Sequence, residues 1–175
     1  VVHGVLLKPL PFPEPDRVVQ VWGNMPARQL SNVSLTEANF WDMRDWNRAF
    51  EELGALHGAS FTLTGEGMAP ARASGARVSV GFFRALGVQP VAGRLFEPGE
   101  DEPGAVAERV LLSNDLWRQP FGGDRGIVGG TILLDNVPYQ VVGVLPAGSP
   151  WLNAADVFVP FIRRTDANRG SWEYV

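Results

Sequence analysis

Residues 109–146 read RVLLSNDLWRQPFGGDRGIVGGTILLDNVPYQVVGVLP and contain the clearest succession of secondary-structure signals in the chain. The aliphatic run Arg109–Leu112 predicts a β-strand. Ser113-Asn114-Asp115 supplies side chains that cap a helix, and the glycines that follow end this helix within about two turns. The runs Thr131–Leu134 and Tyr139–Val144 flank a short turn and predict a hairpin. The stretch therefore predicts one strand-helix-hairpin unit.

The residues before this unit predict further strands and helices around it. Arg17–Trp22 alternates in the manner of a strand, and residues 23–33 read as a polar loop. A helix is predicted from about Thr36 to about Asn47, because a capping pattern precedes it. A second, short helix is predicted over residues 81–86, where Gly87 ends it. Strands combined with a few short helices predict the α+β class.

The first predicted helix has an apolar stripe. Phe40, Met43, Trp46 and Phe50 recur at spacings of three and four residues, and Trp41 broadens the stripe. Such a stripe indicates core packing far more often than a binding face. We therefore expect these side chains to be buried.

Composition limits the classes of protein to which the chain can belong. Its 175 residues are 45 % hydrophobic and 19 % charged, which is typical of a globular domain. The net charge of −4 argues against nucleic acid as a partner, because phosphate binding needs concentrated Lys and Arg. The absence of cysteine excludes thiol catalysis, thiolate metal sites and disulfides. No stretch approaches the roughly 20 apolar residues that span a bilayer.

The sequence contains no recognisable catalytic or cofactor motif. His3 and His57 are the only imidazoles, and no Gly-x-Ser-x-Gly motif occurs. The glycine pairs at 122–123 and 129–130 are not followed by the Gly-Lys-Ser/Thr of a phosphate-binding loop. We therefore predict no enzyme activity and no catalytic, cofactor-binding or metal-binding residue.

One acidic loop and one tryptophan form the candidate functional surface. Glu100, Asp101 and Glu102 belong to the only local concentration of carboxylates, but their spacing does not fit a calcium-binding loop. Prolines at both ends favour an exposed loop. Trp151 is the tryptophan that we expect to be exposed. These four residues are the candidate surface for a partner or substrate.

Several motifs follow one another in an order that resembles a known family. They are Val5–Pro13 with Asp16–Val19, Phe40–Arg44 with Phe50, Phe82–Val88 with Gly93-Arg94, Leu116-Trp117 with Phe121–Asp124, and Tyr139–Pro146. In this order the motifs resemble the MacB-like periplasmic core domain of ABC transporter permeases of the FtsX-like type. The resemblance extends over nearly the whole chain. Pro120, Gly130 and Asn136 depart from the family pattern.

The resemblance implies a two-lobed architecture. One lobe is a porter-like βαβ unit, and the other is a smaller inserted α/β lobe that contains the strand-helix-hairpin unit. The implied ranges are 1–16 for an extended arm after a membrane helix, 17–88 for the first half of the porter-like lobe, 89–160 for the inserted lobe and 161–175 for the start of the return segment. The chain is expected to continue beyond Val175.

The resemblance also implies a non-catalytic role in transport. The domain would lie on the periplasmic face of the inner membrane and couple the motion of membrane helices to the handling or export of a substrate. A cytoplasmic ABC ATPase would be a partner, the permease would be a homodimer or a pair, and a periplasmic adaptor is a further candidate partner. No cofactor is implied.

Two other functions are compatible with the residues alone. A secreted carbohydrate-binding or glycan-processing domain is favoured if Trp151 and the acidic loop line one cleft. A protein-binding adaptor is favoured if the apolar N-terminal arm, Val1–Pro13, packs against a partner.

Overall fold

The computed structural model describes residues 14–25, 29–65, 68–148 and 155–165. Its elements in chain order are η1 (Pro15–Arg17), β1 (Gly23–Met25), β2 (Leu30–Val33), α1 (Glu37–Asp45), β3 (Leu56–Gly65), β4 (Met68–Val78), α2 (Phe82–Ala85), β5 (Ala92–Gly93), β6 (Arg109–Leu112), α3 (Asn114–Arg118), η3 (Arg125–Ile127), β7 (Thr131–Leu134), β8 (Val137–Val144) and β9 (Val157–Pro160). The fold is mostly sheet with few helices, which confirms the predicted α+β class.

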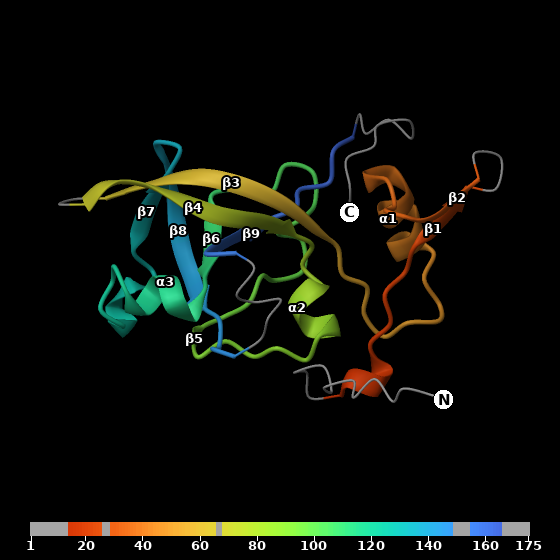
Figure 1. Ribbon diagram of the computed structural model, residues 1–175, viewed down its shortest axis with the longest axis horizontal. Coiled ribbons are helices and arrows are strands. Elements are labelled where there is room, and N and C mark those ends of the chain that lie inside the picture. Colours follow the sequence, from red (N-terminus) through yellow and green to blue (C-terminus); the bar gives the residue numbers. More distant parts are fainter. Residues whose placement is uncertain (1–13, 26–28, 66–67, 149–154, 166–175) are drawn as a thin grey trace, which may run out of the picture.

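Seven strands of the described residues form one sheet in the order β5-β8-β6-β9-β4-β3-β7 (Figure 1). β7 also pairs with β8, so the strand pairs β3-β4-β9-β6-β8-β7 close into a ring. β4 and β9 are parallel, as are β6 and β8, and the other pairs are antiparallel. β3 and β4, from the predicted range 17–88, therefore share a sheet with β7 and β9, from the predicted range 89–160. The predicted domain ranges stay a prediction.

The strand-helix-hairpin unit predicted for residues 109–146 is present as β6, α3, β7 and β8. Ser113 caps α3, since its side chain accepts a hydrogen bond from the backbone N–H of Leu116. The turn between β7 and β8 holds Asp135 and Asn136 at φ of 52° and 65°, the left-handed conformation that a two-residue hairpin turn requires. The local sequence therefore determines this unit.

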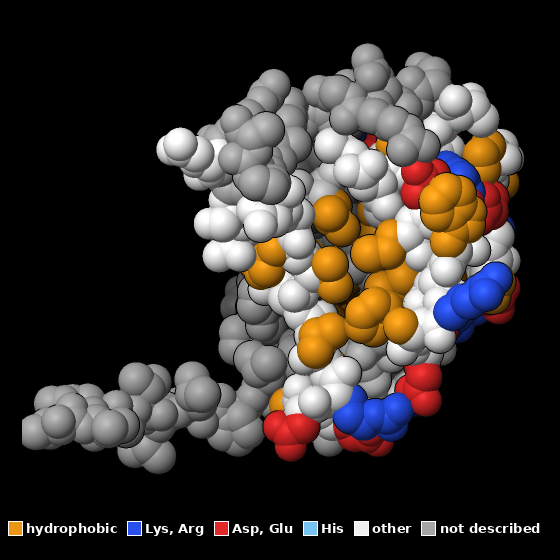
Figure 2. Space-filling view, turned by 90° about the vertical axis from the view of Figure 1, so that its right-hand side faces the viewer, with side chains coloured by type: hydrophobic (Ala, Val, Ile, Leu, Met, Phe, Trp, Pro, Cys, Tyr) orange, Lys and Arg blue, Asp and Glu red, His pale blue; other side chains and the backbone are white. Residues whose placement is uncertain are grey.

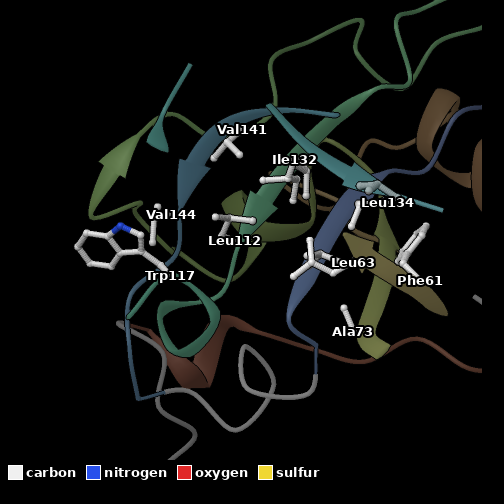
Figure 3. Packing of buried hydrophobic residues seen from close by; sticks show 12 residues of the cluster. Phe61, Leu63, Ala73, Leu112, Trp117, Ile132, Leu134, Val141 and Val144 are labelled. Atoms are coloured by element: carbon white, nitrogen blue, oxygen red, sulfur yellow. The ribbon is translucent and has the colours of Figure 1, made fainter. Parts of the chain in front are cut away.

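The interior of the closed sheet is filled by aliphatic and aromatic side chains (Figure 3). The buried members are Phe61, Leu63, Ala73, Val110, Leu112, Trp117, Ile132, Leu134, Val141, Val144, Val157 and Val159. Alternate residues of the same strands face outward, as the two-residue period of a strand requires. Leu111 and Phe158 belong to this outer set, where they share a cluster with Phe83 of α2. Both faces of β6 and β9 are therefore buried.

A third, smaller cluster joins α1 to the sheet, with α1, β1 and β2 at one end of the molecule (Figure 1). Phe40 and Trp41 are buried there and pack against Phe161, which stacks on Trp41 at 5.6 Å. The predicted burial of the whole stripe is wrong for Trp46, which is 78 % exposed, and for Phe50, which is 40 % exposed. The reason is that α1 ends at Asp45, so the helical spacing does not extend to these two residues.

Two other local predictions were wrong. The polar loop predicted for residues 23–33 contains the antiparallel pair of β1 and β2. The strand predicted for Arg17–Trp22 is absent, and residues 18–22 lie in no strand or helix.

A backbone contact between β8 and β5 makes Gly143 a sensitive position. A Cβ at Gly143 would lie 2.4 Å from the carbonyl oxygen of Arg94, which is a backbone atom and cannot rotate away. We expect Gly143→Ala to lower the free energy of unfolding by roughly 1–3 kcal/mol in urea unfolding. Gly58→Ala is the control, because a Cβ there meets nothing within 4 Å. Equal stability of the two variants would contradict this packing.

Tyr139, beside Phe61, gives the fold a pH dependence. Burial, with a contribution from Glu108, raises the pKa of Tyr139 above its ordinary value of 10.0. The unfolded chain therefore ionises first as pH rises. We expect the free energy of unfolding to fall once the pH exceeds about 10 and to be unaffected by this group below that pH. Urea unfolding of Tyr139→Phe should lack the fall that the unsubstituted chain shows; the same fall in both would exclude Tyr139 as its source.

Candidate functional site

The predicted acidic loop is held by arginines. The Glu100 carboxylate accepts hydrogen bonds from Arg94, at 2.8 Å from Nη2 and 3.2 Å from Nη1, and is also paired with Arg109. The backbone N–H of Glu97 donates to it at 3.0 Å. Glu100 is only 6 % exposed, so this carboxylate is saturated by contacts inside the domain.

Asp101 is more deeply buried than Glu100. It is 1 % exposed, and its Oδ2 accepts hydrogen bonds from the backbone N–H of Val80 at 2.8 Å and from Arg44 of α1 at 3.1 Å. Arg44 also pairs with Glu102, and the backbone N–H of Arg163 donates to the Asp101 carbonyl at 2.8 Å. One arginine therefore joins α1 to the acidic loop.

The exposure predicted for this loop is wrong for Glu100 and Asp101, because Arg94 and Arg109 pair with Glu100 and Arg44 pairs with Asp101. Glu102 is partly exposed. Trp151 lies outside the described residues. The assignment of these four residues to a partner or substrate surface stays a prediction.

Further contacts link α1 to the segment after β9. Glu37, which is buried, accepts a hydrogen bond from the backbone N–H of Arg164 at 3.1 Å, and its Oε2 lies 3.3 Å from Nε of Arg164. Arg163 pairs with Asp45 at 2.8 Å. The Arg44 guanidinium lies 4.3 Å from the centre of the Trp41 ring. We call the contacts of Glu37, Trp41, Arg44 and Asp45 with residues 101–102 and 161–164 the α1 clamp.

Sequence reasoning missed the α1 clamp. Its partners are far apart in the chain, 57 residues for Arg44 with Asp101 and 127 residues for Glu37 with Arg164. No local spacing signals such pairs. Only the fold brings these arginines to the carboxylates.

An apolar groove lies beside α1. It has a volume of about 330 Å³ and is bordered by residues 17–21, by α1, by residues 50–56 and by α2. Figure 2 shows apolar side chains gathered in a hollow on this face of the molecule. Val19 and Val21, at its border, are 61 % and 37 % exposed. We call this hollow the α1 groove.

The described residues contain no grouping of His, Asp and Glu side chains that could hold a metal ion. His57 lies on β3 opposite Arg77, and His3 lies outside the described part of the chain. Among the helices of the described ranges, none is long and apolar enough to cross a membrane.

The α1 clamp makes Arg44 important for stability. Arg44→Ala would leave the buried Asp101 carboxylate without its cation, so we expect the free energy of unfolding to fall by about 2–3 kcal/mol. Arg17→Ala is the matched control, because Arg17 pairs with the exposed Glu14 and Glu51, and its loss should change the free energy of unfolding far less. Urea unfolding of both variants measures the difference. A loss for Arg44→Ala no larger than that for Arg17→Ala would show that the α1 clamp does not stabilise the fold.

The fold is similar to solved domains of transporters and permeases. The extracellular domain of the noncanonic ABC-type transporter YknZ from Gram-positive bacteria has a TM-score of 0.58 and 18 % identity, over 73 % of this chain and 63 % of that chain. The periplasmic region of MacB from Actinobacillus actinomycetemcomitans has a TM-score of 0.56 and 14 % identity, over 80 % and 62 %. A domain of a putative permease protein from Porphyromonas gingivalis has a TM-score of 0.53 and 17 % identity, over 76 % and 55 %.

At these identities the three structures show the fold alone. The chain spans less than two thirds of the length of each of them. Comparison with curated proteins gives no significant match.

A family model settles the resemblance seen in the sequence motifs. The model described as "MacB-like periplasmic core domain" matches residues 9–174, which is nearly the whole chain. The predicted extracytoplasmic location is confirmed with it, since this core domain lies on that side of the inner membrane. The chain therefore belongs to the family of MacB-like periplasmic core domains.

Proposed function

We propose that the chain is a non-catalytic domain of an ABC-type permease and that it transmits the motion of membrane helices to the handling or export of a substrate. The observation that carries this proposal is the family match over residues 9–174. The described residues are compatible with a non-catalytic role. The carboxylates of Glu100 and Asp101 form ion pairs with arginines within the domain.

The α1 clamp supports mechanical coupling. α1 is held to the acidic loop through Arg44 and to the segment after β9 through Glu37 and Asp45. Because the carboxylates of Glu37 and Asp101 are buried and costly to leave unpaired, a displacement of α1 would move the closed sheet with it. The domain would therefore move as a rigid body and would not absorb the motion in a flexible joint.

The partners follow from the same proposal. A cytoplasmic ABC ATPase would supply the energy, and the permease would act as a homodimer or as a pair of related chains, with a periplasmic adaptor as a further partner. In this arrangement, residues 1–16 are the arm from a membrane helix. Residues 17–88 would form the first half of a porter-like lobe, residues 89–160 an inserted lobe and residues 161–175 the start of the return segment.

The alternative functions gain no support from the comparisons. A carbohydrate-binding cleft between Trp151 and the acidic loop would need free carboxylates, whereas Glu100 and Asp101 are buried. The family match points instead to transport.

Nucleotide-dependent hydrogen exchange in the full-length permease, purified with its ATPase, tests the proposal. A non-hydrolysable ATP analogue should change amide exchange in α1, in residues 97–104 and in residues 161–164, because the α1 clamp joins them. In Arg44→Ala the change at residues 97–104 should be lost, and in Arg17→Ala it should persist. If the analogue leaves exchange unchanged throughout the domain, the coupling role is wrong.

A further inference from the structure

We draw no further inference here: the strongest candidate, the apolar α1 groove between residues 17–21, α1, residues 50–56 and α2, carries none, because nothing in the described part of the chain shows what covers it.

Discussion

The pairing of β7 with both β3 and β8 is the interaction on which the closed sheet depends. Without it, the sheet would have an open edge and its interior side chains would face water. The turn after β7 strengthens this closure, because Asp135 accepts a hydrogen bond from the backbone N–H of Thr62 at 2.8 Å and donates its own N–H to the Thr62 carbonyl at 2.9 Å. A short hairpin thus joins strands from distant parts of the chain.

The second constraint is electrostatic. Burying the carboxylates of Glu100 and Asp101 would be costly if they were alone, and the arginines at 94, 109 and 44 offset that cost. The sequence predicts that this loop is exposed, whereas in the structure the loop connects α1 to the sheet.

The α1 groove is a further feature of the surface beside α1. Val19, Val21 and Phe50 are exposed at this groove, whereas Phe40, which also lines it, is buried.

The sequence by itself determined the family, the α+β class and the strand-helix-hairpin unit of residues 109–146. These follow from local signals: the Ser113 cap, the left-handed turn at Asp135 and Asn136, and the order of motifs. A cap or a turn is formed by neighbours in the chain, so its residues can be read directly.

Only the tertiary structure decided the closure of the sheet, the burial of the acidic loop and the exposure of Trp46. Closure depends on pairs between β3 and β7, which are far apart in the chain, and burial of Asp101 depends on Arg44, 57 residues away. Trp46 is exposed because α1 ends one residue before it. Contacts between distant residues leave no periodic pattern in the sequence, so they can be identified only in the folded structure.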